Sequence, residues 1–355
     1  MKILLNKRTA IAAIMSLFII GVCNAKQQNK LSDNASKTIS SEAAQFLSTW
    51  PGPGIWPQMP RPENIEAWKA IQAGVIASTI KRVESAISQF KITIVKREIS
   101  GVKVLDVRPE NWKDDGKVLI YIHGGGYTLY DAMSSMEASA VMADATGLKV
   151  ISIDYTTAPH SKWRNTLEQT TSVFKGLLEQ GYSMDELAIY GDSAGGAMVA
   201  GTVLKLRDEG IGMPSSVVLW SPWADIDTTK GDSYKTLRTA EPILAIGTFL
   251  NPSAIAYADE KDFMHPYVSP VYGDYTKGFP PTLIQGGTKE IFLSNFVRLY
   301  QKMDTEGAKV KLDLYDSMPH VFQYLLLNAP ESRLAVKKSA DFIRKHFDKV
   351  GTNLR

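Results

Sequence analysis

The sequence predicts an α/β protein: a mostly parallel, eight-stranded sheet with helices on both faces. Three observations support this. Two segments of alternating apolar residues form a β-hairpin around residue 100, and strands and helices then alternate to the end of the chain. A Gly-x-Ser-x-Gly sequence also joins the fifth strand to the helix after it. The content of 44% hydrophobic and 22% charged residues is typical of a folded protein with a large core.

Residues 1–25 have the pattern of a secretory signal peptide. Three basic residues precede an apolar run over 11–22, and Cys23-Asn24-Ala25 provides small residues for cleavage. The run is shorter than the roughly 20 residues that span a membrane, so we expect no stable membrane insertion after signal removal. The sequence therefore predicts export to the periplasm or the medium. A lipid anchor on Cys23 is the alternative, disfavoured by the bulky Val22, and a retained N-terminal anchor is a further one.

Removal of the signal would change two bulk properties. Cys23 is the only cysteine, so the mature chain would have no disulfide and no cysteine-based metal or redox site. The signal also carries three basic residues and no acidic ones, so its loss takes the net charge from +3 to zero. This balance predicts no nucleic-acid partner. The sequence does not determine the oligomeric state, and a homodimer is compatible with it.

Residues 26–88 are expected to form a mobile leader followed by helices. The stretch 26–41 is polar and rich in Ser, Asn and Lys. Residues 50–57 hold too many Pro and Gly for regular structure; Trp50 and Trp56 either line a pocket or fix this segment in place, and the second interpretation is favoured. Apolar residues at helical spacing then predict a helix over 64–88.

The catalytic domain is expected over 89–355, with strands bounded by polar and turn residues. The predicted strands cover 92–99, 102–107, 118–122, 150–154, 186–190, 217–220, 282–285 and 309–315. The predicted helices after the hairpin cover 134–146, 167–180, 194–209, 294–306 and 332–349. The connection after the sixth strand, with its insertion over 224–278, is far longer than usual and lies where a lid or specificity element would sit.

Ser193 is the predicted nucleophile. It stands in Gly191-Asp192-Ser193-Ala194-Gly195-Gly196, between a strand and a helix, which is the arrangement of a nucleophile elbow. Glycine two residues to either side removes the Cβ atoms that would collide in so tight a turn. An ordinary glycine-rich turn is the alternative interpretation of this sequence alone.

A serine hydroxyl needs a base, and the chain has five histidines. His320 follows the final strand, whose carboxyl end shares an edge of the sheet with the elbow, so His320 is the predicted base. The acid must be a carboxylate between serine and histidine in the sequence. Glu290, in the loop after the seventh strand, is the predicted acid, with Asp313 and Asp316 as alternatives.

The loop after the third strand is the candidate oxyanion hole. Gly124, Gly125 and Gly126 let the backbone approach a substrate closely, and the N–H of Ala194 adds a donor from the elbow. A flexible loop or a phosphate cradle is the alternative for a glycine run. Nucleotide binding is disfavoured, because the chain has neither a Gly-Lys-Ser/Thr ending nor a Gly-x-Gly-x-x-Gly helix start here.

These motifs together resemble the hormone-sensitive-lipase family of α/β-hydrolases. The resemblance rests on four segments: His123-Gly-Gly-Gly-Tyr127, Gly191-Asp-Ser-Ala-Gly-Gly196, Ser221-Pro-Trp223 and Met318-Pro-His-Val-Phe322. It implies a serine carboxylesterase with an α/β-hydrolase fold and no cofactor. It also implies a cap built from the N-terminal helices and the long insertion, and a loop-shaping role for His123.

The chain departs from the family pattern at two places. Where the family has Leu-Ala-Pro-Glu, this chain has Thr157-Ala-Pro-His160, so that glutamate is missing. The family acid is more often an aspartate followed five residues later by a second aspartate; here these positions are Glu290 and Asn295. A glutamate carboxylate is chemically sufficient as the acid, so the departures weaken only the inference about substrate.

The expected function is hydrolysis of short- to medium-chain carboxylic esters through a Ser-His-Glu triad and a covalent acyl-enzyme. Tyr127, Trp220 and Phe322 are candidate substrate-binding residues, although aromatic residues beside strands more often belong to the core. Hydrolysis of another acyl bond, in a lactone, an amide or an acetylated sugar, is the first alternative. A non-catalytic protein that binds a small ligand on the same fold is the second.

Overall fold

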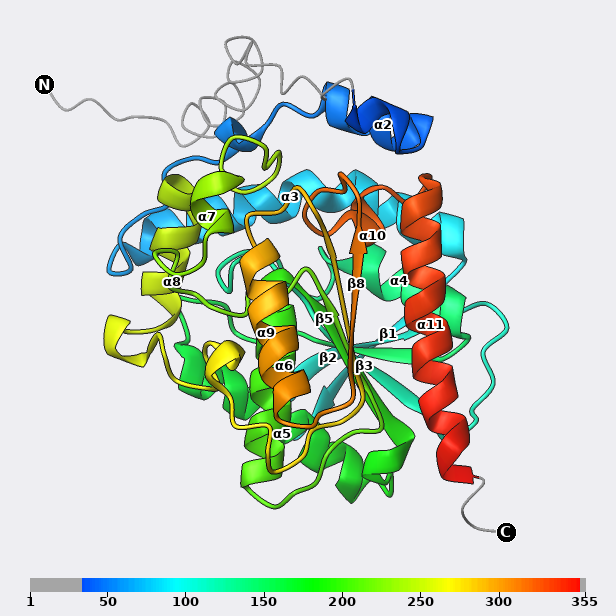
Figure 1. Cartoon of the computed structure of the whole chain (residues 1–355). Coiled ribbons are helices and arrows are strands. Elements are labelled where there is room, and N and C mark those ends of the chain that lie inside the picture. The colour runs from blue at the N-terminus through cyan, green and yellow to red at the C-terminus, as the bar shows by residue number, and fades with distance from the viewer. Residues whose placement is uncertain (1–33, 352–355) are drawn as a thin grey trace, which may run out of the picture.

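The computed structural model describes residues 34–351, and an eight-stranded sheet forms their centre (Figure 1). The strands are β1 (Thr93–Ile99), β2 (Val102–Arg108), β3 (Val118–Ile122), β4 (Lys149–Ile153), β5 (Leu187–Asp192), β6 (Val217–Trp220), β7 (Thr282–Gly287) and β8 (Val310–Tyr315). They lie in the order β1-β2-β4-β3-β5-β6-β7-β8. The pairs β1–β2 and β2–β4 are antiparallel and all others are parallel, so the predicted mostly parallel sheet is confirmed.

The strands at the centre of the sheet are apolar throughout because both of their faces are covered. All five residues of β3 and all five of β4 are buried. Strand β3 lies between β4 and β5, with Ile122 paired to Ile153 on one side and to Gly191 on the other. The chain thus passes from β3 to β4 on one side and then crosses back to β5 on the other side of β3. Such a switch point opens a crevice at the carboxyl ends of the strands.

Five long helices cover the two faces of the sheet (Figure 1). One face carries α5 (Trp163–Glu179), α6 (Ser193–Asp208) and α9 (Leu293–Thr305), and the other carries α4 (Met136–Thr146) and α11 (Pro330–Gly351). The side chains between sheet and helices form two large apolar clusters, one on each face. Helix α6 is almost entirely buried, which explains its small residues and its lack of a polar face.

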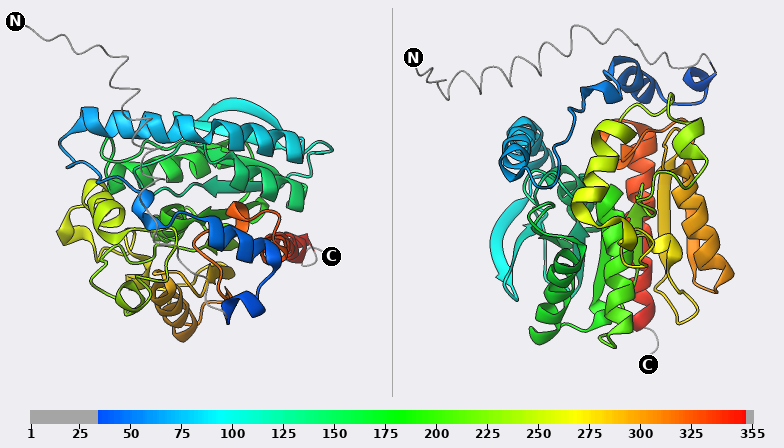
Figure 2. Two further views of the ribbon diagram at one scale, coloured as in Figure 1. Left: turned by 90° about the horizontal axis from the view of Figure 1, so that it is seen from above. Right: turned by 90° about the vertical axis from the view of Figure 1, so that its left-hand side faces the viewer.

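Two further parts of the chain lie over the end of the molecule toward which β8 points (Figures 1 and 2). The first part holds α2 (Ser41–Thr49) and α3 (Ile65–Phe90). The second part holds α7 (Ser233–Thr236), then a π-helical turn over Ile246–Leu250, and then α8 (Asn251–Tyr257). A short helix, α10 (Phe322–Leu325), follows β8 at the same end. Single 3₁₀ turns occur at Ala35–Lys37, Pro53–Ile55, Met184–Glu186, Glu260–Asp262 and Pro270–Tyr272.

The described part of the predicted mobile leader is held against the C-terminal half of the chain. The Thr38 hydroxyl donates to Asp316 over 2.7 Å, and the backbone N–H and hydroxyl of Ser40 both donate to Glu331 over 2.7 Å. These contacts also precede a helix, α2, that the composition of the segment did not predict; Ser40 caps it by accepting from the Ala43 N–H. The predicted signal peptide, with Cys23, lies outside the described residues. No helix within residues 34–351 is long and apolar enough to cross a membrane.

Candidate active site

Ser193 occupies the sharp turn between β5 and α6. Its φ of 55° lies in the left-handed region, which costs energy for any residue with a Cβ atom. The flanking glycines make the turn possible: a Cβ on Gly191 would come within 2.7 Å of the Ile122 carbonyl oxygen, and one on Gly195 would come closer still. This tight turn places the Ser193 hydroxyl at the carboxyl edge of the sheet, as in a nucleophile elbow.

The structure brings Ser193, His320 and Glu290 together in a single hydrogen-bonded series. His320 Nε2 lies 2.9 Å from Ser193 Oγ, and His320 Nδ1 lies 2.7 Å from Glu290 Oε2. The side chains are almost fully buried, at 6%, 3% and 0% exposure for the serine, histidine and glutamate. With Nδ1 protonated toward the carboxylate, Nε2 is free to accept the serine proton.

The second oxygen of Glu290 is held by two donors to which the sequence analysis assigned no role. The Ser221 hydroxyl donates to Oε1 over 2.8 Å, and the Gly287 N–H donates to it over 2.6 Å. Ser221 Oγ also accepts the N–H of Val321, the residue after the histidine, over 3.1 Å. One hydroxyl therefore positions both the acid and the loop of the base. The sequence held two signals for this: the place of Ser221 directly after β6, at the carboxyl edge, and its position in the Ser221-Pro-Trp223 segment that resembles the family pattern.

The two alternative acids are engaged elsewhere. Asp313 accepts from Lys338 over 2.8 Å and from the Gln285 side chain over 3.0 Å, so its carboxylate faces α11. Asp316 accepts from Thr38. Among the described residues, Glu290 is the carboxylate that bonds the imidazole of His320.

The glycine loop after β3 presents backbone N–H groups beside Ser193, but one predicted donor needs correction. The Gly124 N–H donates to Asp192 Oδ1 over 3.0 Å and is therefore occupied within the protein. Gly125 and Gly126, with φ of 102° and 61°, donate no hydrogen bond within the described part of the chain. The Ala194 N–H is in the first turn of α6, where the helix offers no acceptor. These three N–H groups remain the candidates for an oxyanion hole.

Buried polar side chains hold the glycine loop in place through hydrogen bonds and ring packing. Asp192 accepts from the Tyr121 hydroxyl over 2.6 Å and from the Tyr324 hydroxyl over 2.9 Å, in addition to the Gly124 N–H. His123 is fully buried, stacks on Tyr155 with ring centroids 4.2 Å apart, and has Nδ1 2.8 Å from the Gly124 carbonyl. Burial lowers the pKa of His123. A neutral histidine that fixes the loop fits this environment better than a base.

A cavity of about 200 Å³ opens at Ser193 and His320. Much of its wall is apolar and comes from the segment before α3 and from the insertion: Trp50, Ile55, Trp56, Ile243, Leu244 and Phe249. The Trp56 ring stacks on Phe249 at 4.3 Å between centroids, and its Nε1–H donates to the Ile243 carbonyl over 2.6 Å. Trp50 and Trp56 therefore line the cavity, while the prediction favoured a purely anchoring role; Trp56 does both.

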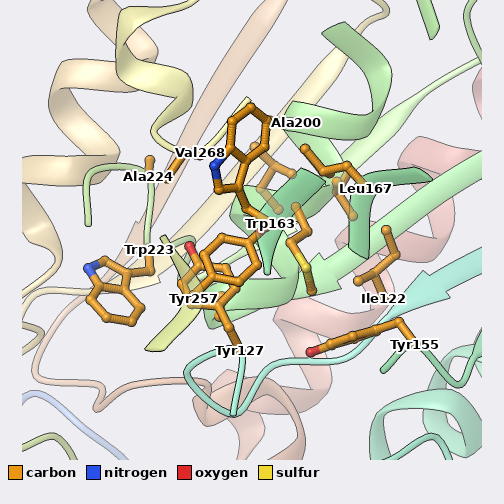
Figure 3. Close-up of a cluster of buried hydrophobic side chains, with 14 of the residues drawn as sticks. Ile122, Tyr127, Tyr155, Trp163, Leu167, Ala200, Trp223, Ala224, Tyr257 and Val268 are labelled. Carbon is orange, nitrogen blue, oxygen red and sulfur yellow. The ribbon is translucent and has the colours of Figure 1, made fainter. Parts of the chain in front are cut away.

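The three aromatic residues predicted to bind substrate do not line this cavity, and we do not retain that prediction. Tyr127 stacks on Tyr257 at 3.8 Å inside the core beneath the glycine loop, where Trp223 also packs (Figure 3). Trp220 points to the other face of the sheet and donates from Nε1 to Ser339 of α11 over 3.0 Å. Phe322 is buried in the small cluster below α2 and packs on Tyr315. Position next to a catalytic motif did not reveal which way each ring points.

Glu241 is a buried carboxylate near the triad that the sequence did not single out. Its side chain is 1% exposed, and its oxygens accept the N–H groups of Ile243, Leu244 and Ile291 over 2.7, 3.2 and 3.1 Å. Ile243 and Leu244 line the cavity, and Ile291 follows the acid Glu290. The pKa of Glu241 is raised to about 7, mainly by burial; the charge of His320 opposes the rise and that of Glu290 adds to it.

The residues that replace the usual family pattern have their own partners. His160 Nε2 lies 2.9 Å from the side-chain oxygen of Gln72, whose amide donates to the carbonyls of Thr128 and Ala158 over 2.8 and 3.2 Å. Gln72 thus ties α3 to the glycine loop. Asn295 is fully buried, and its amide donates to the Tyr234 hydroxyl over 3.2 Å. An amide in place of a second carboxylate leaves Glu290 as the acid in its loop.

Known proteins resemble this chain across most of its length. Residues 119–324 match the family described as alpha/beta hydrolase fold. The acetyl-hydrolase of Streptomyces hygroscopicus is 34% identical over 67% of this chain and 78% of its own. The crystal structure of an esterase from the bacterial hormone-sensitive lipase family is 31% identical and superposes with a TM-score of 0.69, covering 72% of this chain and 85% of its own. That of esterase E25 is 28% identical, with a TM-score of 0.81 and coverage of 87% and 94%.

The shared fold, the matched residues and the elbow geometry agree with the family that the motifs resemble. The match includes β3 with its glycine loop, the elbow, the acid loop and His320. The chain belongs to the hormone-sensitive-lipase family of α/β-hydrolases.

Proposed function

We propose that this protein is an exported serine carboxylesterase for short- to medium-chain esters. The observation that carries the proposal is the hydrogen-bonded series from Ser193 Oγ through His320 to Glu290, next to free backbone N–H groups and a cavity. Relatives named esterase and acetyl-hydrolase support the reaction class, and the chain is a carboxylic-ester hydrolase.

In the proposed mechanism Ser193 Oγ attacks the ester carbonyl carbon while His320 Nε2 takes the hydroxyl proton. The N–H groups of Gly125, Gly126 and Ala194 stabilise the oxyanion of the tetrahedral intermediate. The carbon–oxygen bond to the alcohol then breaks, and the alcohol leaves with the proton from His320, so that the acyl group stays on the serine.

Deacylation repeats these steps with water as the nucleophile. His320 accepts a proton from the water as its oxygen attacks the acyl carbon, then returns the proton to Ser193 as the carboxylic acid leaves. Glu290 stabilises the imidazolium in both halves of the reaction and keeps the ring in the productive orientation. Ser221 and Gly287 prevent the carboxylate from turning away, since they occupy its second oxygen.

The proposed size limit on the substrate follows from the cavity. Its volume of about 200 Å³ is below the roughly 300–1,000 Å³ typical of sites for drug-sized ligands. The aromatic and aliphatic wall suits an unbranched acyl chain of a few carbons. We assign the wall to a cap made of residues 41–90 and 224–278, which lie over the carboxyl edge of the sheet.

The test is hydrolysis of p-nitrophenyl butyrate by the protein that starts at Lys26, compared with Ser193→Ala. Loss of the nucleophile should reduce kcat by about 10⁴-fold or more. A fluorophosphonate probe should add one phosphonyl group to Ser193, detected by mass spectrometry, and none to the variant. Equal rates for the two proteins would overturn the proposal.

Turnover of a lactone or an amide in preference to esters would replace the substrate class and keep the mechanism. Absence of both turnover and adduct would favour a binding protein.

A further inference from the structure

The residues that line the cavity at Ser193 fall into two groups of opposite chemistry, called here the apolar lobe and the polar lobe. The apolar lobe is the wall of Trp56, Ile243, Leu244 and Phe249 already described. The polar lobe is defined by the side chains of Arg82, Tyr130, Ser134, Ser135, Glu137 and Tyr324. Different elements build them: the apolar lobe comes from the chain before α3 and from the insertion, while the polar lobe comes from α3, the start of α4 and α10. Helices α4 and α10 lie across the molecule from α7 and α8 (Figure 1).

Both lobes reach the glycine loop where an ester carbonyl would sit. A Cβ on Gly126 would come within 2.7 Å of the Phe249 ring in the apolar lobe. A Cβ on Gly125 would come within 2.6 Å of the Tyr130 ring in the polar lobe. Residues of both lobes therefore flank the glycine loop, and an ester bound with its carbonyl oxygen at these N–H groups would lie between them. The ester that fills both has one apolar and one polar end.

The polar groups of the second lobe extend from the surface into the protein, beginning with the Arg82 side chain, which is 42% exposed. The Glu137 side chain is 13% exposed, and Ser134 is 2% exposed. The Arg82 guanidinium lies 3.5 Å from the Glu137 carboxylate, so a donor and an acceptor stand side by side with no net charge between them. Burial raises the pKa of Glu137, and the charge of Arg82 partly opposes this. The Tyr324 hydroxyl donates its proton to Asp192, which leaves its oxygen able to accept.

We infer that the polar lobe binds an uncharged, hydroxylated part of the ester, such as the polyol of a glycerol or sugar ester; this rests on the proposed esterase function. Hydroxyl groups both donate and accept, which matches an arginine beside a carboxylate and a tyrosine oxygen. A substrate carboxylate would meet Glu137, and a substrate ammonium group would meet Arg82. An alkyl group would displace water from the ion pair without replacing its hydrogen bonds, which is costly.

A matched pair of esters tests the inference in the protein that starts at Lys26. Glycerol 1-butyrate and n-propyl butyrate share the acyl group and the carbon skeleton of the alcohol and differ only in two hydroxyls. Their hydrolysis is followed by titration of the released butyric acid at constant pH. We expect kcat/KM to be about tenfold or more higher for the glycerol ester, mainly through KM.

Substitutions assign the preference to the polar lobe. Arg82→Met should reduce the ratio of the two kcat/KM values about tenfold. Lys81→Met removes the same charge one residue earlier, from an exposed position outside the cavity lining, and should leave the ratio unchanged. Glu137→Gln frees Arg82 from its counter-ion and should raise kcat/KM for 3-butyryloxypropanoate, whose carboxylate is on the alcohol side, relative to n-propyl butyrate.

The outcomes separate this inference from the proposed function. Hydrolysis of both esters with no preference, or an equal effect of Arg82→Met on both, would overturn the polar-lobe assignment and leave the esterase standing. Hydrolysis of neither ester, nor of p-nitrophenyl butyrate, would overturn both. A preference that Arg82→Met and Lys81→Met reduce equally would also reject the assignment, because the effect would then come from net charge and not from the lobe.

Discussion

Single residues around the triad hold its three side chains in position, and Ser221 is the clearest case. Its hydroxyl bonds both Glu290 Oε1 and the Val321 N–H, so Ser221→Ala would leave a buried carboxylate oxygen with one donor fewer and a buried N–H without an acceptor. We expect kcat for p-nitrophenyl butyrate to fall about 10- to 100-fold with little change in KM, because the loss acts through the acid and base rather than on bound substrate.

Ser216→Ala is the matched control for Ser221. Ser216 is also fully buried, one residue before β6, and its hydroxyl has no hydrogen-bond partner among the described residues. Its replacement should leave kcat and the melting temperature nearly unchanged. If the two variants lost activity to the same extent, the effect would belong to packing along β6, and the positioning role of Ser221 would be rejected.

The titration of a single residue, Glu241, should make the stability of the fold depend on pH. Its pKa of about 7 in the folded chain lies above its ordinary value of 4.5, so the folded state holds this proton more tightly than the unfolded state does. Stability from this group is therefore fully present below pH 4.5 and is lost as the pH rises through 7. The loss amounts to about 3 kcal/mol at most.

The measurement is urea unfolding of the wild type and of Glu241→Gln between pH 5 and 8. The amide has a similar shape and does not titrate, so the variant should lack this part of the decline. Its stability relative to the wild type should therefore increase over the range, toward the limit of about 3 kcal/mol. Parallel curves for the two proteins would show that Glu241 keeps an ordinary pKa in the folded state.

At the scale of elements, the irregular segment before α3 shapes the apolar lobe. Trp56 is fixed by its stack on Phe249 and its hydrogen bond to Ile243, so it joins this segment to the insertion. Trp56→Ala should enlarge the apolar lobe and remove a partner from Phe249. We expect the ratio of kcat/KM for p-nitrophenyl octanoate over the butyrate to rise several-fold.

Trp112→Ala serves as the comparison for Trp56→Ala. Trp112 packs against the Arg108 guanidinium at the end of β2 and does not line the cavity. Its loss removes an indole of the same size without touching the substrate wall, so the chain-length ratio should stay at the wild-type value. A similar change in both variants would indicate general loosening of the fold, and the assignment of Trp56 to the acyl wall would fail.

The strands and long helices were the elements most readily predicted from the sequence. Buried parallel strands are continuous apolar runs, and the predicted bounds of β3 and β6 agree with the structure. Helix α2 was not predicted, because it is held by long-range contacts with Glu331 and Asp316 rather than by a strong apolar period. The helices of the insertion were not predicted for a similar reason: they are four to seven residues long and are fixed by contacts with distant parts of the chain, such as the stack of Tyr257 on Tyr127.

At the scale of the whole molecule, the sequence predicted which residues meet and did not predict which way neighbouring rings point. Ser193, Glu290 and His320 each follow a strand of one parallel sheet, so topology alone brings them to the same edge. The orientation of Trp220 depends on the pleat of β6, and that of Tyr127 on a left-handed φ of 65° in the glycine loop. Gly124 was assigned as a donor because Asp192 was not recognised as its acceptor. Contacts across the fold decide these details.

The N-terminal part of the chain allows a prediction about the whole molecule. Removal of residues 1–25 deletes the proposed signal peptide and none of the described contacts, so the shortened protein should keep the melting temperature and kcat/KM of the exported protein. Removal of residues 1–49 also deletes α2, whose Ala43 packs in one cluster with Met318 and Phe322, on either side of His320. Exposure of that cluster should lower the melting temperature by several degrees and reduce kcat.

Mass spectrometry of the exported protein and thermal unfolding of the two truncated proteins check this together. The exported chain should begin at Lys26, whereas a chain that begins at a lipid-modified Cys23 would replace the cleaved signal by an anchor. Both forms of the exported chain keep the bonds from Thr38 and Ser40 to Asp316 and Glu331, because these residues follow both cleavage sites. If removal of residues 1–49 left both stability and kcat unchanged, α2 would be a passive extension, and its support of the His320 loop would be excluded.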